Sequence, residues 1–130
     1  MSGGFTPALK TVSDLVTAEA SVLASEHGMV KRVGVTIDAT TVGVVDSLGN
    51  KPMKAGTIVG KITSGGKYAA YDNALSNGRE VAAGILTESI NLKDGDVITG
   101  ILMHGSVLEA RISGLDSGAR ADLAGRIIFQ

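Results

Sequence analysis

Short runs of apolar and β-branched residues, separated by glycine-rich turns, dominate the middle of the chain. Residues 57–59 and 62–63 are rich in β-forming side chains, and the segment Ser64-Gly65-Gly66 interrupts the run. Residues 67–71 then have the composition of a returning strand. Two such runs around a glycine-containing break predict a β-hairpin.

A second turn and a third strand are predicted directly after this hairpin. Asn77-Gly78 suits a hairpin turn that needs positive φ angles at both positions. Residues 81–86 follow as a compact apolar strand. Gly84 lies inside that strand and has no side chain to pack, so it predicts a bulge or a close approach of another backbone.

Before this block, alternation of apolar and polar positions predicts two more strands. Val33, Val35 and Ile37 alternate with polar or small residues, which is the period of a half-buried strand. Residues 42–45 predict another strand, closed by a turn at residues 47–50. Residues 11–25 are ambiguous, since their apolar positions have helical spacing and their propensity favours a short helix.

The last third of the chain predicts further strands and one helix. Residues 89–92 and 97–103 flank a turn at residues 93–96, and residues 107–112 are expected to pair with 97–103 through a turn at His104. We therefore expect an antiparallel sheet.

A short helix is predicted over residues 117–123. Asp116 or Ser117 can cap its first turn, and Gly125 provides a stop. Residues 127–129 form a last apolar strand. The chain has no internal repeat or linker, so the pattern predicts a single, mainly β domain with a short C-terminal helix, spanning residues 11–130.

Residues 1–10, MSGGFTPALK, differ from the rest. They combine Gly3-Gly4 with Pro7 and have no apolar periodicity that would hold them in a core. They predict a flexible N-terminal arm, and an ordinary frayed terminus fits the same composition.

Composition narrows the function classes. Aromatic residues make up 3% of the 130 residues, so the core must be built from Val, Ile, Leu and Ala. A net charge of -1, from 12 basic and 13 acidic residues, argues against a nucleic-acid surface. The absence of cysteine excludes disulfides and fits a reducing cytosol. The pattern shows no signal peptide and no apolar run of about 18 residues, so we expect a soluble protein.

Each candidate for chemistry has a simpler explanation. Residues 60–67 have the wrong spacing for a phosphate loop, and Tyr68 stands where such a loop needs Ser or Thr. Asp94-Gly95-Asp96 lacks the remaining ligands of a calcium loop. His27 and His104 lack a second ligand at metal-binding spacing, and His104 beside Gly105 suggests a turn residue. We therefore predict no catalytic residue, no cofactor and no metal.

Five segments, taken in succession, resemble the head decoration proteins of tailed bacteriophages, the lambda-type capsid-stabilising family. They are AGTIVGKI at 55–62, GKY at 66–68, DNALSNGREVAAGIL at 72–86, DGD at 94–96 and ILMHGSVLEARI at 101–112. The resemblance implies a small β-tulip or barrel-like domain. It also favours a strand and loop, rather than a helix, for residues 11–25.

The same resemblance implies a non-enzymatic function. It suggests a cement protein of the virion, made in the host cytoplasm, that binds the outer surface of the mature head as a homotrimer at threefold and quasi-threefold sites. Its partner would be the major capsid protein, with no direct contact to nucleic acid or membrane. The arm would add a strand to a neighbouring capsid protein, through Gly4, Phe5, Thr6, Pro7, Ala8 and Leu9.

Two other function classes remain open on the sequence alone. One is a non-viral β-barrel ligand-binding module, although the scarcity of aromatic rings counts against a sugar site. The other is a small enzyme with a site at a subunit interface, for which Arg79, Glu80 and His104 are the first residues to inspect.

Overall fold

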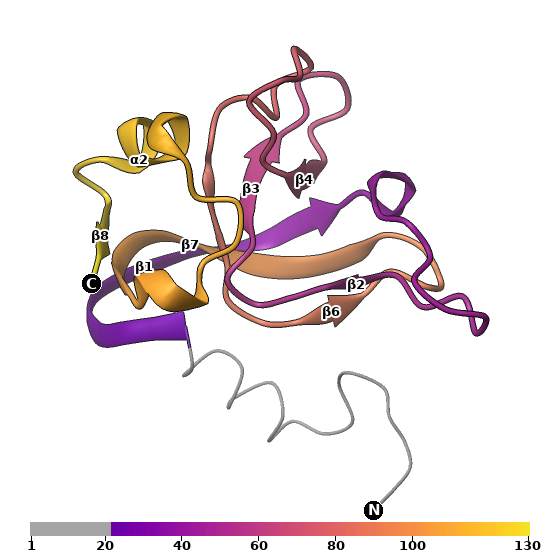
Figure 1. The fold of residues 1–130 in the computed structure, drawn as a ribbon, viewed down its shortest axis with the longest axis horizontal. Helices are drawn as coiled ribbons and strands as arrows, with labels where there is room; N and C mark the ends of the chain where they lie inside the picture. The colour runs from indigo at the N-terminus through magenta and orange to yellow at the C-terminus, as the bar shows by residue number, and fades with distance from the viewer. Residues whose placement is uncertain (1–21) are drawn as a thin grey trace, which may run out of the picture.

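The computed structural model describes residues 22–130, apart from the side chains of residues 24–28. The arm predicted at residues 1–10 and most of the ambiguous stretch 11–25 lie outside the described residues. The elements, shown in Figure 1, are β1 Leu23–Ile37, η1 Ala39–Thr41, β2 Pro52–Met53, β3 Ile58–Lys61, β4 Tyr68–Ala70, β5 Gly84–Leu86, β6 Ile90–Asn91, β7 Val97–Val107, η2 Glu109–Arg111, α2 Ser117–Leu123 and β8 Ile127–Phe129.

Six strands form one sheet in the order β1-β4-β3-β5-β7-β8, and an additional pairing joins β1 to β7. The pairings therefore close a ring through β1, β4, β3, β5 and β7, with β8 added beside β7, while β2 and β6 form a separate two-stranded sheet. The mainly β, barrel-like architecture with one short C-terminal helix is the fold class that the sequence predicted.

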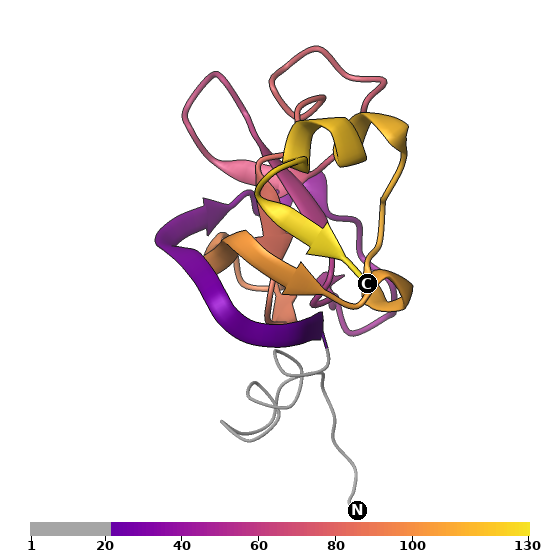
Figure 2. The ribbon, with the colours of Figure 1, turned by 90° about the vertical axis from the view of Figure 1, so that its left-hand side faces the viewer.

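The expectation of a purely antiparallel sheet is wrong at two pairings. β1 pairs with β4 in parallel, and β7 pairs with β8 in parallel. The second case has a simple cause, since α2 lies between β7 and β8 in the chain and such a crossover lets the next strand return in the same direction. Figure 2 shows β8 between α2 and β7.

Both faces of the central strands are buried. Adjacent residues of β3, β5 and β7 enter two different apolar clusters. Ile58, Ile85 and Leu102 pack with Leu123 of α2. The residues next to these three in the chain belong to the second cluster and are Val59, Leu86 and Ile101. This cluster also includes Met53 of β2 and Ile90 of β6. Burial on both sides explains why these strands appear in the sequence as short continuous apolar runs.

Two glycines illustrate how closely the strands and loops approach. A Cβ at Gly84 would lie 2.8 Å from the carbonyl oxygen of Leu102, which confirms the predicted close backbone approach. Gly78 has a φ of 109°, but Asn77 does not have a positive φ. β4 and β5 both pair with β3 rather than with each other, so the hairpin predicted at Asn77-Gly78 is wrong. The segment instead folds back on the chain, and Thr63 N donates to Asn77 O at 2.8 Å.

Three other local predictions were wrong. Residues 42–45 form no strand and belong to a loop, although the predicted turn at 47–50 is present. β7 runs without a turn through His104 to Val107, because it pairs with β1 along its length. Residues 109–111 consequently form η2 rather than a returning strand.

The predicted helix and its cap are confirmed. α2 spans Ser117–Leu123, and the Asp116 side chain accepts a hydrogen bond from Ala119 N at 2.8 Å. The carboxylate also accepts from Tyr71 Oη at 2.9 Å and from Asn73 Nδ2 at 2.8 Å, so it ties the helix to the segment after β4. The hairpin of β3 and β4 and the strand β8 are confirmed as well.

Candidate functional site

An open groove of about 620 Å³ lies between the segment after η1, the β2–β3 connection and η2. Among the described residues that line it, none is acidic and two, Lys54 and Arg111, are basic. The remaining lining residues are small or apolar: Thr41, Val42, Gly43, Pro52, Met53, Ala55, Thr57, Ala70, Ala110, Ile112 and Ser113. We call this the groove.

Backbone contacts fix one wall of the groove. Ser113 N donates to Gly56 O at 2.9 Å, and Ile58 N donates to Ser113 O at 3.2 Å. Gly56 has a φ of 96°, and a Cβ there would lie 2.1 Å from the carbonyl oxygen of Arg111. The sequence must therefore have glycine at position 56 for the segment after η2 to lie against the start of β3.

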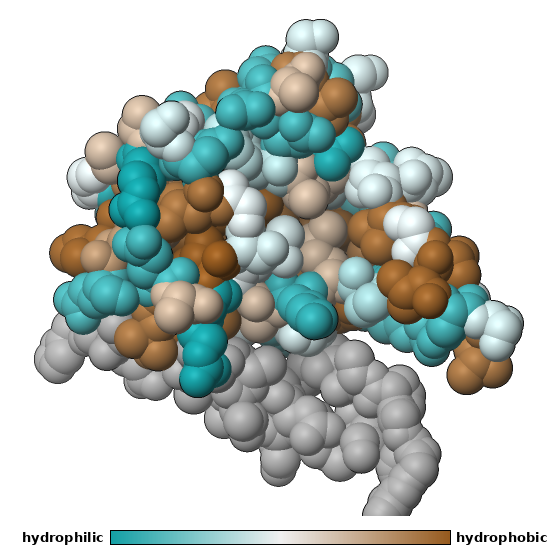
Figure 3. All heavy atoms as spheres, viewed as in Figure 1, coloured by the Kyte–Doolittle hydropathy of each residue, from teal (hydrophilic) through white to brown (hydrophobic). Residues whose placement is uncertain are grey.

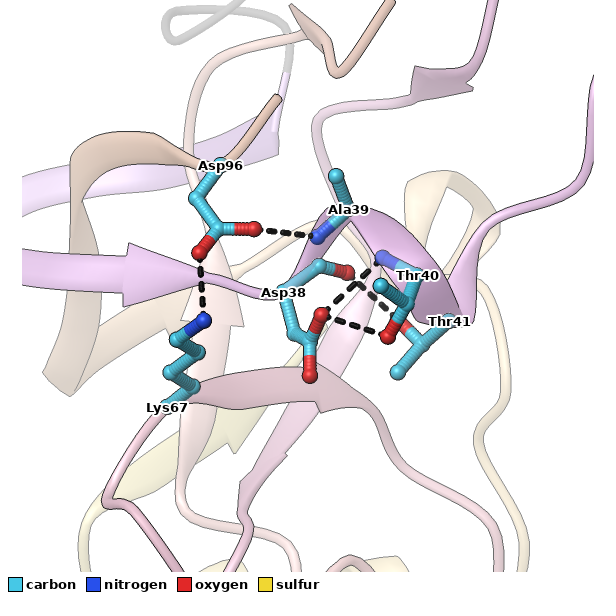
Figure 4. A network of polar contacts seen from close by, with 6 residues as sticks. All are labelled: Asp38, Ala39, Thr40, Thr41, Lys67 and Asp96. Atoms are coloured by element: carbon cyan, nitrogen blue, oxygen red, sulfur yellow. Dashed lines mark hydrogen bonds and ion pairs between the residues drawn. The ribbon is translucent and has the colours of Figure 1, made fainter.

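The opposite wall begins at η1, which a polar network holds in position (Figure 4). Asp38 caps η1 and accepts from Thr40 N at 2.9 Å and from Thr40 Oγ1 at 2.7 Å. Asp96 accepts from Ala39 N at 2.8 Å through Oδ1, and its Oδ2 lies 2.6 Å from Lys67 Nζ. The Ala39 hydrogen bond, followed by the Lys67 contact, lowers the pKa of Asp96. The network joins the end of β1 to the β3–β4 hairpin and to the turn before β7.

The loop after η1 exposes three aliphatic side chains. Val44, Val45 and Leu48 are 60%, 65% and 70% exposed, and we call them the apolar loop. In Figure 3, brown residues gather at the right-hand end of the visible face, where this loop lies in Figure 1.

The apolar loop has a defined conformation because Asp46 organises it. The Asp46 carboxylate accepts from Leu48 N at 3.0 Å, from Asn50 N at 3.2 Å and from Asn50 Nδ2 at 2.8 Å. The Asn50 hydrogen bonds hold the pKa of Asp46 below its usual value. Asn50 is itself connected to β6, since Asn91 Nδ2 donates to Asn50 Oδ1 at 3.1 Å. The loop is thus an ordered protrusion whose apolar ends point away from the core.

Large apolar side chains are also exposed on the β1–β7 ribbon, and Val33 and Ile98 are the most exposed of them. Val33 is 80% exposed and Ile98 is 71% exposed. The register between β1 and β7 shifts between Arg32 and Val35, and Gly34 has a φ of 76°. This irregularity turns Val33 outward while Val35 and Ile37 stay buried, so the predicted alternation holds only beyond Gly34.

The described residues were also compared with the requirements of a metal site and of a membrane span. Residues 22–130 contain no cluster of three or more His, Asp or Glu side chains suited to a metal ion. No described helix is long and apolar enough to cross a membrane. What the described surface offers is an apolar protrusion beside a groove, which is suited to contact with another macromolecule.

Comparison with known proteins agrees with that interpretation. Residues 11–124 match the protein family described as Bacteriophage lambda head decoration protein D. The chain belongs to this family. A comparison with curated proteins finds no match. The resemblance expected from the five segments is therefore confirmed over most of the chain.

Family membership answers three of the questions that the sequence left open. A head decoration protein is a structural component of the phage capsid and not an enzyme, and it sits on the capsid surface of the virion. It binds the capsid, which excludes the non-viral ligand-binding module as the interpretation of this chain.

The structure also locates the residues that sequence reasoning singled out. The predicted arm contacts, Gly4 to Leu9, lie outside the described residues. Arg79 Nε donates to Ala70 O at 2.9 Å, and Glu80 accepts from Gly78 N at 2.8 Å, so both side chains stabilise the loop after β4. His104 lies within β7 opposite Val30, so its predicted role as a turn residue is wrong.

Sequence reasoning missed the groove and the apolar loop. The sequence predicts a strand at residues 42–45 because β-branched valines are typical of strands. The sequence does contain a signal for a turn at this point. Asp46 follows the valines directly, and Gly49 and Asn50 come soon after it, which is typical of a turn capped by an Asp side chain. The groove had no local signal, since its lining comes from segments far apart in the chain.

Proposed function

We propose that this head decoration protein is a cement protein of the mature head. It binds the outer surface as a homotrimer at threefold and quasi-threefold positions, where it bridges neighbouring major capsid proteins and stabilises the shell against internal DNA pressure. The observation that carries this proposal is the family match over residues 11–124.

The arm is proposed as the main capsid contact. Residues 4–9 would add a strand to a neighbouring capsid protein, with Phe5 and Leu9 as apolar anchors and backbone hydrogen bonds supplying the rest. The described part of the chain begins inside the domain, where Leu23 pairs with Val107 and Leu108 N donates to Val22 O at 2.8 Å. Twenty-one residues precede Val22.

Trimer formation would convert weak contacts into stable attachment. Once one arm of a trimer is bound, the second and third arms bind intramolecularly at a high effective concentration. A ligand stabilises the state to which it binds, so a protein that prefers the expanded shell would shift the equilibrium toward that shell. Expansion of the head would then create the binding site, and the timing of attachment would need no enzyme.

A binding assay with isolated heads tests this proposal. The full-length protein and a variant lacking residues 2–10 are mixed with expanded and unexpanded heads, and the bound protein is measured after sedimentation. We expect the full-length protein to bind only expanded heads and the deletion to lose most of this binding. A variant in which residues 2–10 are replaced by a Gly/Ser segment of equal length serves as the matched control, because it keeps the length and removes the anchors.

Two results would contradict different parts of the proposal. Full binding by the deletion variant would show that the arm is not the main contact. Failure of the full-length protein to bind any head would contradict the cement function itself. Melting curves of all three proteins are expected to coincide, because the core residues that the structure describes lie between Val22 and Phe129, outside the altered segment.

A further inference from the structure

We propose that the apolar loop of one copy occupies the groove of the next copy. The protein would then associate through a repeated head-to-tail contact that closes into a ring. This inference rests on the proposed homotrimer and assigns the residues that hold it together. The contact joins Val44, Val45 and Leu48 of one copy to the groove between β2 and η2 of its neighbour.

The first argument is the exposure of an ordered apolar surface. The three aliphatic side chains of the apolar loop are each at least 60% exposed, so their own chain does not bury them. The loop nevertheless has its own hydrogen bonds, including Val45 N to Asn50 O at 2.9 Å and those of Asp46. An exposed apolar patch on a rigid support is typical of an interaction surface. Its rigidity also reduces the entropy lost on binding.

The second argument is the match between the loop and the groove. The groove is lined mainly by aliphatic and small residues, and three of these are the alanines Ala55, Ala70 and Ala110, which leave room for a partner's side chains. Its volume of about 620 Å³ lies within the range of 300–1,000 Å³ that is usual for binding pockets.

Charge supports the same pairing. The two basic residues of the groove, Lys54 and Arg111, have no acidic neighbour among the described lining residues. The charged residue between the valines and the leucine of the apolar loop is Asp46, an acid. Seating the loop in the groove would bring this carboxylate toward the two basic residues. A symmetric loop-to-loop contact would instead bring two Asp46 carboxylates together, which is unfavourable.

The third argument concerns symmetry. The protrusion and the groove are different surfaces on one chain, so a contact that repeats in one direction from copy to copy is heterologous, and such contacts form either closed rings or open filaments. Val42 and Gly43 line the groove, and Val44 begins the apolar loop directly after them. Neighbouring donor and acceptor surfaces can both face a central axis, which favours a small closed ring over a filament.

Cysteine cross-linking tests the contact directly. The chain contains no cysteine, so every thiol in a double variant is an introduced one. We would prepare Val45→Cys with Ala110→Cys and treat it with a short bis-maleimide, at high concentration in solution and also bound to expanded heads. We expect a covalent trimer as the largest product, because each copy carries one donor and one acceptor thiol.

Matched variants show whether the product is specific. Each single-cysteine variant can link at most two chains and is expected to remain largely unlinked. The control pair Val33→Cys with Val81→Cys places both thiols at exposed positions outside the apolar loop and the groove, and we expect no trimer from it. Absence of a trimer from the Val45/Ala110 pair in both settings would overturn the inference.

Mixing experiments distinguish a contact between loop and groove from a contact between two loops. A loop variant, Val44→Ser with Val45→Ser and Leu48→Ser, keeps an intact groove, whereas Ala110→Arg fills the groove and keeps the loop. Alone, each is expected to give no oligomer, and mixed they should form a dimer through the one remaining loop-groove contact. The control variant Val33→Ser with Val81→Ser should associate like the unmodified protein, and melting curves establish that all variants fold.

The outcomes separate this inference from the proposed function. A loop variant that still forms trimers on heads overturns the inference and leaves the cement function intact. A loop variant that stays trimeric but no longer binds heads would assign the apolar loop to the capsid protein instead. Failure of the unmodified protein to bind heads would contradict the cement function, while cross-linking in solution would still decide the loop-groove contact.

Discussion

The hydroxyl of Tyr71 donates a hydrogen bond of 2.9 Å to Oδ1 of Asp116, the residue that caps α2. A Cβ at Gly118 would lie 2.7 Å from this hydroxyl, so the first turn of the helix leaves space for it. One carboxylate therefore connects the segment after β4 to the C-terminal helix that covers the first apolar cluster.

This contact predicts a loss of stability at high pH. Burial, followed by the hydrogen bond to Asp116, raises the pKa of Tyr71 from 10.0 to about 12. Because the folded pKa is the higher one, the stabilisation is fully present below pH 10 and is lost as the pH rises through 10 toward 12. We expect Tyr71→Phe to have a lower melting temperature at pH 7 and a smaller further decrease between pH 9 and about 12.

Tyr68→Phe is the matched control, because it removes the other tyrosine hydroxyl and leaves the bond to Asp116 in place. If the two variants showed the same alkaline dependence of melting temperature, the Tyr71–Asp116 contact would not be its source.

The network at η1 predicts a loss of stability at low pH. The hydrogen bond from Ala39 N and the contact with Lys67 lower the pKa of Asp96 from 3.8. Because the folded pKa is the lower one, this stabilisation is present above the unfolded pKa and is lost as the pH falls below it. We expect Asp96→Asn to melt earlier at pH 7 and to lose less stability on acidification. Asp94→Asn, in the same turn, should behave like the unmodified protein, and equal acid profiles for the two variants would contradict the assignment.

The close approach at Gly78 predicts a stability difference between two glycines. Gly78 has a φ of 109°, and a Cβ there would lie 2.2 Å from the carbonyl oxygen of Lys61. Gly49 has a φ of 83°, but a Cβ at that position would meet no atom within 4 Å. Thermal unfolding should show a larger decrease in melting temperature for Gly78→Val than for Gly49→Val. Equal decreases in melting temperature would mean that backbone strain at a positive φ, and not the clash with Lys61, determines the loss of stability.

β7 provides a test of the core with an internal control. Leu102 is fully buried in the first apolar cluster, whereas Ile98 on the same strand is 71% exposed. Leu102→Ala should lower the free energy of unfolding by about 2–5 kcal/mol, because it removes buried methyl groups and leaves a cavity. Ile98→Ala should change it by no more than about 0.5 kcal/mol in urea denaturation. A similar decrease in the free energy of unfolding for the two variants would be incompatible with the described orientation of β7.

Features that depend on a few adjacent residues could be predicted from the sequence. The helix at 117–123 was found because Asp116 caps it and Gly125, with a φ of 83°, follows it. The sequence predicts the β3–β4 hairpin because Gly65 and Gly66 separate two β-forming runs, and both glycines have positive φ angles in the observed turn. In each case the decisive interactions lie within a few positions of one another, so local propensity and turn chemistry contain the information.

Features that depend on distant partners were decided by the tertiary structure. Val44 and Val45 have the composition of a strand, but no neighbouring strand among the described residues pairs with them and Asp46 closes a turn instead. β7 continues through His104 because β1 pairs with it over that length, and a single strand's sequence does not reveal its partner. The groove combines Thr41, Lys54 and Arg111 from three separate segments. The sequence by itself thus determined the turns, the helix and which segments are apolar enough to form strands. The closure of the strand ring and the groove depend on pairing between segments far apart in the chain, which no local pattern encodes.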